Sequence, residues 1–243
     1  MYEPRTYRDW VSDKDLVSFS VVIKETDLRI RARRDLTSEA LSATQRYRTD
    51  LETYIKSHPV FLTTLKPFEV EHDAPSIVKE MADAAREAGV GPMAAVAGAI
   101  AERVGRELLP YSDEVIVENG GDIFLRTLKE RFIGVYAGES KFSRKIAFSI
   151  RPEETPLGVC TSSGTVGHSL SFGYADAVIV FSPSTSLADA AATAIGNRVR
   201  TVEDIPEALE FAQSMKGLKG VAIIKGDNMG LWGQIKLAPV DSG

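Results

Sequence analysis

The sequence contains a single cysteine, and it lies close to a histidine. Cys160 and His168 both fall within a segment rich in serine, threonine and glycine. A cysteine becomes a nucleophile when an imidazolium or clustered N–H groups lower the pKa of its thiol. Cys160 and His168 are therefore the candidate catalytic residues. The alternative is a buried, inert thiol beside a structural histidine. With one cysteine, an intrachain disulfide framework and a multi-cysteine metal site are excluded.

The segment around this cysteine could bind phosphate. It runs from Gly158 to Gly173, and ten of its sixteen residues are Ser, Thr or Gly. Backbone N–H groups and hydroxyls in such a segment can surround phosphate oxygens. The segment matches neither the P-loop nor the GxGxxG pattern. The alternative is a hydroxyl-lined surface loop. The candidate nucleotide-binding residues are Thr161, Ser162, Ser163, Gly164 and Thr165.

A second candidate binding segment directly follows the apolar run VIV. Its residues are Asn119, Gly120, Gly121 and Asp122. A Gly-Gly pair at the end of a strand allows positive φ angles and lets a ligand approach the backbone closely. The alternative is a plain turn.

The third candidate segment, LADAAATAIGN, carries Asp189 and Thr193 four residues apart. On a helix this spacing places both side chains on one face. Mg²⁺ prefers oxygen ligands and is typically held by one or two carboxylates together with substrate phosphates. The pair is therefore a candidate Mg²⁺ site. The alternative is an aspartate that only interacts favourably with the helix dipole.

The elements that must position these residues follow from the hydrophobic pattern. Connections of hairpin length between most predicted strands favour an α+β fold, with largely antiparallel sheets and helices packed on one side. We expect Thr37 to cap the first helix, whose apolar stripe includes Leu41. The predicted strands are 17–23, 28–33, 114–117, 122–126, 132–137, 145–150, 165–172, 177–181, 220–225 and 231–237. The predicted helices start at Thr37 and Pro75 and span 92–108, 186–199 and 204–215.

Net charge and hydrophobic pattern argue against a nucleic-acid binder, a secreted protein and a membrane-spanning protein. The 243 residues carry a net charge of −5, which argues against a general nucleic-acid binder. The first ten residues, MYEPRTYRDW, are charged and lack the apolar core of a secretory signal. The longest uncharged stretch, 88–101, is too short to span a membrane. We therefore expect a cytoplasmic protein that does not bind membranes.

Three of these motifs, taken in order, resemble one family. VENGGDI, VCTSSG and SLADAAATA are similar to segments of the ApbE-like superfamily, which includes the FAD:protein FMN transferases. GPMAAVAGAIAE occupies the place of that family's glycine-rich helix start. The resemblance implies an ApbE-like, T-fold-related architecture in which Asp189 and Thr193 bind Mg²⁺. It also implies that the helix start contacts a flavin nucleotide such as FAD. We expect a single domain over 1–243, with the core motifs in 90–200 between an N-terminal part (1–88) and a C-terminal part (201–243).

The longer motifs resemble a compact, conserved branch of that superfamily. Some members of this branch occur in methane-producing archaea and are associated with the assimilation of sulfide into homocysteine. This resemblance implies a second hypothesis, in which Cys160 carries a persulfide and passes its sulfur to a protein partner.

The sequence also departs from the transferases. They carry an H-x-I-D-P-x-T-G segment before the metal helix, and this chain has none, which argues against flavin transfer itself. The first hypothesis is therefore a small-molecule site that binds a nucleotide or flavin with Mg²⁺. The second is sulfur transfer, and the third is a binding protein without catalysis. Expected edge strands and an alanine-rich helix would also allow a homodimer.

Overall fold

The computed structural model describes residues 15–164 and 173–239. Eight strands form one sheet in the order β1-β2-β3-β4-β7-β8-β9-β10, and every neighbouring pair is antiparallel. These strands are β1 (Val17–Ile23), β2 (Thr26–Ala32), β3 (Val115–Asn119), β4 (Asp122–Arg126), β7 (Leu157–Ser162), β8 (Ala177–Ser182), β9 (Gly220–Lys225) and β10 (Asn228–Gly233). A second, three-stranded sheet has the order β11-β6-β5, with β5 (Arg131–Gly134), β6 (Ile146–Ile150) and β11 (Lys236–Pro239).

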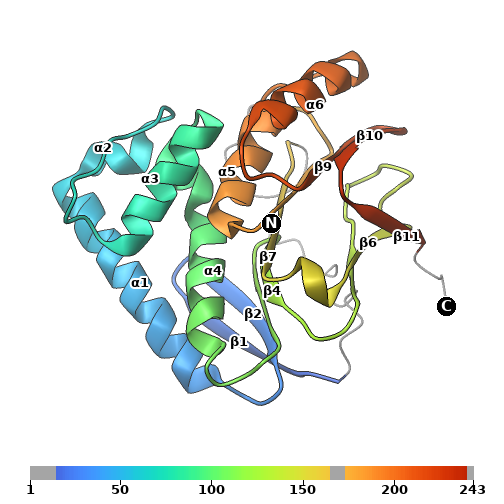
Figure 1. The fold of residues 1–243 in the computed structure, drawn as a ribbon. Coiled ribbons are helices and arrows are strands. Elements are labelled where there is room, and N and C mark those ends of the chain that lie inside the picture. The colour runs from blue at the N-terminus through green and yellow to red at the C-terminus, as the bar shows by residue number, and fades with distance from the viewer. Residues whose placement is uncertain (1–14, 165–172, 240–243) are drawn as a thin grey trace.

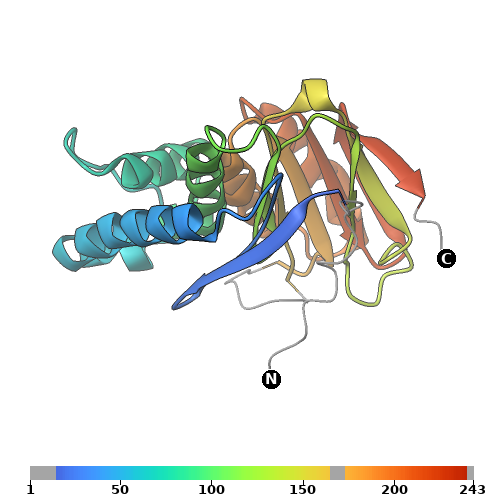
Figure 2. The ribbon, with the colours of Figure 1, turned by 90° about the horizontal axis from the view of Figure 1, so that it is seen from below.

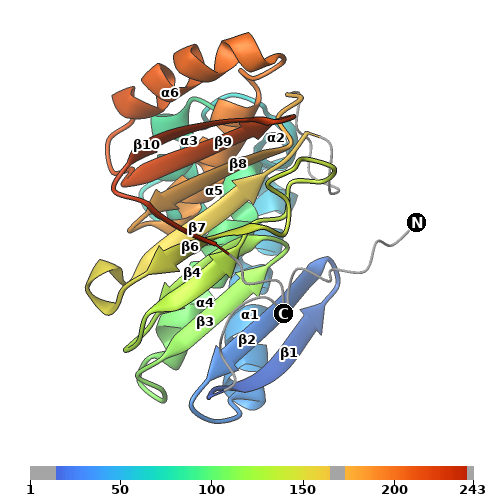
Figure 3. The same cartoon turned by 90° about the vertical axis from the view of Figure 1, so that its right-hand side faces the viewer.

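The helices lie on one face of the large sheet and the small sheet lies on the other (Figures 1 and 2). Figure 3 looks onto the sheets and shows the helices behind them. The α-helices are α1 (Thr37–Ser57), α2 (Pro59–Thr63), α3 (Ser76–Ala88), α4 (Val96–Leu108), α5 (Thr185–Gly196) and α6 (Ile205–Ser214). Short 3-10 turns occur at η2 (Pro92–Ala95), η3 (Pro152–Glu154) and η4 (Val202–Asp204).

Each face of the large sheet buries its own apolar cluster. Because side chains alternate across a strand, Val117 and Phe124 point toward the helices, whereas Ile116 and Leu125 point toward the small sheet. Phe148 of β6 and Phe181 of β8 meet edge to face in the second cluster, with ring centroids 4.9 Å apart. The α+β prediction with largely antiparallel sheets is confirmed.

Several helix ends follow the expected local chemistry. Pro75 precedes α3, and Gly89 ends it in the left-handed conformation with a φ of 72°. The start of α1 differs from the prediction, because Thr37 does not cap it. The Asp35 carboxylate instead accepts hydrogen bonds from the backbone N–H and the hydroxyl of Thr37. The inner face of α1 also uses small residues such as Ala40 and Ala43, while Leu41 is exposed.

Two parts of the predicted strand pattern require correction. The first half of the predicted hydroxyl-rich loop is a central strand, β7, whose residues are mostly buried. The final predicted strand, 231–237, is divided. β10 ends at Gly233, where φ is 93°, and β11 then crosses to pair with β6 in the other sheet. The predicted strand 165–172 lies outside the described residues. Within the described part of the chain, no helix combines the length and apolarity needed to cross a membrane.

Candidate functional site

Four segments that are distant in sequence meet on the helix side of the large sheet. The Asp189 carboxylate on α5 accepts a hydrogen bond from the Gly98 N–H near the start of α4, at 2.8 Å. The Asn119 amide at the end of β3 donates to the Ala97 carbonyl at 3.1 Å. The Cys160 thiol on β7 donates to the Thr185 carbonyl at 3.3 Å. The structure therefore brings together three of the residues that the sequence analysis selected.

Glycines allow these elements to approach so closely. A Cβ added to Gly98 would lie 2.8 Å from Cβ of Asp189 and 2.4 Å from the Thr185 carbonyl oxygen. A Cβ on Gly158 would lie 2.5 Å from Cα of Thr185. Since backbone atoms cannot give way to a side chain at these distances, α5 can lie against both α4 and β7 only because both positions are glycine. This close packing holds Asp189 over the strand that carries Cys160.

Asp122, Cys160 and Asp189 form what we call the acid–thiol cluster. Asp122 lies on β4 two residues before Phe124, whose ring packs among the helices, so the Asp122 side chain points the same way. Burial raises the pKa of Asp122 to about 7, and the charge of Glu118 adds to that shift. The neighbouring Cys160 thiol and the Thr161 N–H act in the opposite direction. Within the described residues, Oδ1 of Asp122 is buried and has no hydrogen-bond partner.

Asp189 provides the second carboxyl of the cluster. Burial raises the pKa of Asp189 well above its ordinary value, and the nearby charge of Asp122 raises it further. The backbone N–H groups of Gly98 and Ala97 partly offset this effect. Asp189 of α5 thus caps the N-terminal turn of α4. At that end of a helix, a negative charge interacts favourably with the helix dipole.

The environment of Cys160 favours the neutral thiol. The side chain is fully buried, and burial together with the charges of Asp122 and Asp189 raises the pKa of the thiol well above its ordinary value. A nucleophilic cysteine needs the opposite shift, which comes from cationic neighbours. The other predicted catalytic residue, His168, lies outside the described residues.

The predicted nucleotide-binding residues do not all face the cluster. Strand alternation places Cys160 and Ser162 on the helix side of β7 and Thr161 on the other side, so the segment cannot act as one continuous hydroxyl cradle. Ser163 and Gly164 follow the end of the strand, and Thr165 lies outside the described residues.

Gly120 and Gly121 connect β3 to β4. Their φ angles are 69° and 112°, as a type I′ turn with two positive φ angles requires. A Cβ on Gly120 would meet no atom within 4 Å, and one on Gly121 would meet only the Thr161 carbonyl oxygen, at 4.0 Å. The turn is therefore open to a ligand on its outer side.

The donor atoms of the cluster fit a hard cation. Asp122 is buried and Asp189 is half-buried, and their carboxyl groups are near enough for the charge of Asp122 to raise the pKa of Asp189. The half-buried Thr193 follows Asp189 by one helical turn. In residues 15–164 and 173–239 there is no group of three or more His, Cys, Asp or Glu residues that could hold a metal ion. A cation here would need further ligands from hydroxyls or from a bound phosphate, which is the usual pattern for Mg²⁺.

Two polar arrangements near the site leave no recognisable signal in the sequence. Glu102 of α4 accepts a hydrogen bond from the Thr185 N–H at 2.6 Å, and so caps α5 from a neighbouring helix. The Thr185 hydroxyl is buried without a hydrogen-bond partner among the described residues. The hydrogen bond from Thr185 to Glu102 joins residues 83 positions apart, which spacing along the chain does not reveal.

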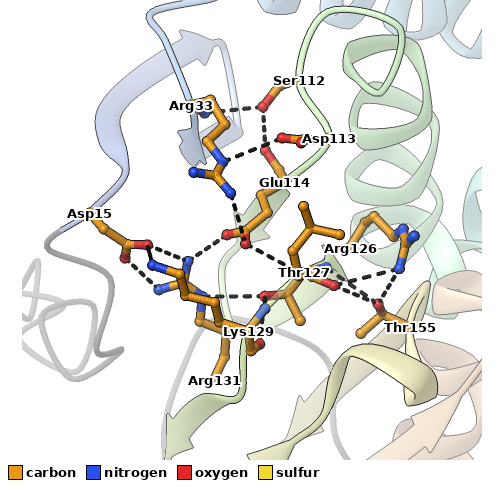
Figure 4. A network of polar contacts seen from close by, with 11 residues as sticks. Asp15, Arg33, Ser112, Asp113, Glu114, Arg126, Thr127, Lys129, Arg131 and Thr155 are labelled. Atoms are coloured by element: carbon orange, nitrogen blue, oxygen red, sulfur yellow. Dashed lines mark hydrogen bonds and ion pairs between the residues drawn. The ribbon is translucent and has the colours of Figure 1, made fainter.

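A second buried polar network lies at the other end of β3 (Figure 4). Glu114 just precedes β3, and its carboxylate accepts a hydrogen bond from Arg131 at 2.5 Å. Arg131 also pairs with Asp15 at 2.7 Å, and Lys129 pairs with Asp15 at 3.0 Å. The pKa of Asp15 is held well below its usual range by the hydrogen bonds from Arg131 and Lys129. This network fastens the chain before β1 to the sheet, away from the acid–thiol cluster.

The family model described as AbpE bacteria matches residues 8–236. The chain belongs to this family. A UPF0280 protein from Methanocaldococcus jannaschii is 45% identical over 221 residues, which cover 88% of this chain and 90% of that protein. Another UPF0280 protein, from Methanococcus vannielii, is 44% identical over 227 residues, covering 91% and 92% respectively.

Solved structures agree with the family at the level of the fold. The apo form of the flavinyl transferase ApbE from Pseudomonas stutzeri superposes with a TM-score of 0.59 and 11% sequence identity. The match covers 89% of this chain and 94% of that chain. The predicted resemblance to the ApbE-like superfamily is therefore confirmed.

Proposed function

We propose that this AbpE-family chain binds a flavin nucleotide such as FAD together with Mg²⁺ at the acid–thiol cluster. The observation that carries the proposal is that burial raises the pKa of both Asp122 and Asp189, and that the charge of Asp122 raises the pKa of Asp189 further. Two like charges buried together are costly unless a cation or protons neutralise them. The fold shared with flavinyl transferases supports a flavin as the organic ligand.

Each part of the site has a proposed task. Asp189 and Thr193 would hold Mg²⁺, with Oδ1 of Asp122 as a further oxygen ligand. When bound, Mg²⁺ supplies positive charge that neutralises a diphosphate. Asn119 holds the Ala97 carbonyl in place, which fixes the start of α4 against the end of β3.

The open outer side of the Gly120–Gly121 turn would admit the ligand without a steric clash. Ser162, Ser163 and Gly164 would lie beside it at the end of β7. Because the chain lacks the H-x-I-D-P-x-T-G segment, we propose ligand binding and not flavin transfer. The buried, neutral thiol of Cys160 gives no support to a persulfide carrier.

The proposal is tested by titrating the purified protein into FAD and following flavin fluorescence, with Mg²⁺ and then with a chelator in its place. We expect saturable quenching. The affinity for FAD should be at least about tenfold higher with Mg²⁺ than with the chelator, because the metal neutralises the charge of the diphosphate. Absence of binding at high micromolar FAD under both conditions would refute the proposal.

Matched variants locate the site. Asp189→Asn removes one charge of the cluster, and Asp122→Asn removes the other. Both should abolish the Mg²⁺ dependence of FAD binding. Asp227→Asn removes a charge from the exposed β9–β10 turn and should bind FAD like the parent protein. If the parent and all three variants bind FAD equally, the ligand lies elsewhere. FAD binding without any turnover would favour the third hypothesis, a binding protein.

A further inference from the structure

Helices α4 and α5 cap each other near their N-termini. The Asp189 carboxylate of α5 accepts a hydrogen bond from the Gly98 N–H of α4 at 2.8 Å. The Glu102 carboxylate of α4 accepts one from the Thr185 N–H of α5 at 2.6 Å. In each helix the residue that supplies the carboxylate lies about one turn after the residue whose N–H is capped. We call these two hydrogen bonds the reciprocal caps, because each helix supplies an acceptor that the first turn of the other lacks.

Close packing makes the two caps depend on each other. A Cβ added to Gly98 would lie 2.4 Å from the Thr185 carbonyl oxygen and 2.8 Å from Cβ of Asp189. One residue of α4 is thus against both the first residue of α5 and the residue one turn later. The Thr185 carbonyl also accepts a hydrogen bond from the Cys160 thiol of β7. Because Thr185 and Asp189 belong to one continuous helix, a displacement of Thr185 is passed on to Asp189.

The Glu102 carboxylate is held in one position. Glu102 is only 5% exposed, and its Oε1 contacts Nε of Arg106 at 2.8 Å and Nη2 of Arg106 at 2.7 Å. The Arg106 guanidinium in turn lies 5.6 Å from the centre of the Phe124 ring. Nearby is Glu80 of α3, where burial and then the charge of Glu102 raise the pKa of the carboxyl. With Oε1 bound to Arg106, Oε2 of Glu102 accepts the Thr185 N–H.

We propose that Glu102 is a positioning residue, which sets where α5 lies against α4 and thereby where α5 holds the Asp189 carboxylate. If the acceptor is withdrawn, the buried Thr185 N–H has to move to find another, because an unpaired N–H in the interior is costly. The first turn of α5 then shifts, and the hydrogen bond from Gly98 to Asp189 lengthens. This position of Asp189 depends on no ligand. The consequence for a bound cation rests on the proposed function.

Two conservative variants separate the position of the Glu102 carboxylate from its charge. Glu102→Gln keeps the length of the side chain and an oxygen acceptor but removes the charge. Glu102→Asp keeps the charge but withdraws the carboxylate by one methylene. A positioning role predicts that the Gln variant behaves like the parent protein and that the Asp variant does not. A role through charge alone predicts the reverse.

The readout is the backbone amide resonance of Gly98 in two-dimensional NMR spectra of the metal-free full chain. The shift of an amide proton follows the length of its hydrogen bond, whereas a loss of global stability leaves the shifts of the folded state unchanged. Asp189→Ala removes the acceptor and so gives the shift of an uncapped Gly98. We expect Glu102→Asp to move the resonance part of the way toward that value, and Glu102→Gln to leave it at the parent position. An unmoved resonance in the Asp variant, or a movement in the Gln variant that is as large, would overturn the proposal.

Glu107 provides a matched control on the same helix. Its carboxylate contacts Arg46 at 2.7 Å and accepts a hydrogen bond from the Tyr47 hydroxyl at 2.8 Å, so it faces α1 instead of α5. Glu107→Asp shortens the same type of side chain by the same amount and should leave the Gly98 resonance in place.

Arg106→Gln tests the same role without changing Glu102. It frees Oε1 of the Glu102 carboxylate and should move the Gly98 resonance in the same direction as Glu102→Asp, by a smaller amount. Because Arg106 is exposed, we expect this variant to fold. Should Glu102→Asp not fold, an unmoved resonance in Arg106→Gln overturns the proposal in its place.

The cation site adds a second measurement, in which FAD binding is titrated with Mg²⁺ for the parent protein and both Glu102 variants. The Mg²⁺ concentration that gives half of its effect should rise about tenfold or more in Glu102→Asp, as is typical when a group that orients a metal ligand is changed. It should stay near the parent value in Glu102→Gln. A parental Mg²⁺ requirement in the Asp variant would show that Glu102 does not position the cation ligand. If the parent protein itself shows no Mg²⁺ dependence, the proposed function fails, whereas the Gly98 resonance still decides the role of Glu102.

Discussion

The Asp189 carboxylate lies 2.8 Å from the backbone nitrogen of Gly98 and accepts its hydrogen bond across the junction of α5 and α4. The Asp189 side chain thus caps the N-terminus of a neighbouring helix and also borders the candidate cation site. Since burial raises its pKa, the neutral amide of asparagine is a close mimic of its protonated form.

This relationship predicts different costs for two substitutions. Asp189→Ala leaves the N–H groups of Gly98 and Ala97 without an acceptor and should lower the free energy of unfolding by about 1–3 kcal/mol. Asp189→Asn keeps an oxygen acceptor and should lower the free energy of unfolding by clearly less. Urea denaturation followed by circular dichroism measures both. Equal losses for Ala and Asn would show that the contact with Gly98 contributes nothing.

The raised pKa of Asp122 predicts an unusual dependence of stability on pH. Its pKa is about 7 in the folded protein and about 4 in the unfolded chain. Between these values the folded state binds more protons than the unfolded state. The free energy of unfolding therefore decreases as pH rises from about 4 to about 7, by an amount on the order of a few kcal/mol.

The Asp122→Asn variant isolates this contribution, because other carboxylates such as Asp15 have lowered pKa values and act with the opposite sign. We expect the variant to be more stable than the parent protein at pH 8 and nearly equal to it at pH 4. Urea unfolding at both pH values measures the difference. A variant less stable than the parent at pH 8 in the absence of metal would contradict the prediction.

Cys160 should react slowly with thiol reagents. It is fully buried, and its raised pKa keeps the thiol protonated at neutral pH. The release of thionitrobenzoate from Ellman's reagent should be very slow for the folded protein at pH 8 and immediate and stoichiometric in denaturant. Rapid labelling of the folded protein would instead restore the persulfide hypothesis.

The ion pair between Arg131 and Glu114 should show strong coupling. Both side chains are almost fully buried, so removal of one partner leaves the other charge without its main counter-ion. We expect Arg131→Met alone to cost about 3–5 kcal/mol of unfolding free energy. The double variant Arg131→Met with Glu114→Gln should cost less than the sum of the two single variants. Additive losses in a double-mutant cycle would show that the two residues act independently.

The sequence predicted most elements because their signals are local. The Gly-Gly pair after VIV indicated the turn between β3 and β4, and Pro75 and Gly89 indicated the limits of α3. β7 was missed because its Gly, Thr and Ser residues were counted as part of a loop. These small residues are instead suited to a central strand against which α5 packs closely, as Gly158 shows.

The site was only partly predictable, because its properties depend on contacts between residues that are distant in sequence. Asp122, Cys160 and Asp189 were selected individually, but their mutual electrostatic effects come from burial and three-dimensional proximity. The pairing of Arg131 with Glu114 also left no trace in residue spacing.

The pairing of β11 with β6 has a consequence for how the protein is made. The small sheet needs residues 236–239 alongside 146–150, so it cannot be completed until nearly the whole described chain has been translated. Until then, one side of the emerging protein lacks its final strand, beside the aromatic contact of Phe148 and Phe181. A nascent chain that stalls before Lys236 would leave this layer open and expose a surface prone to aggregation.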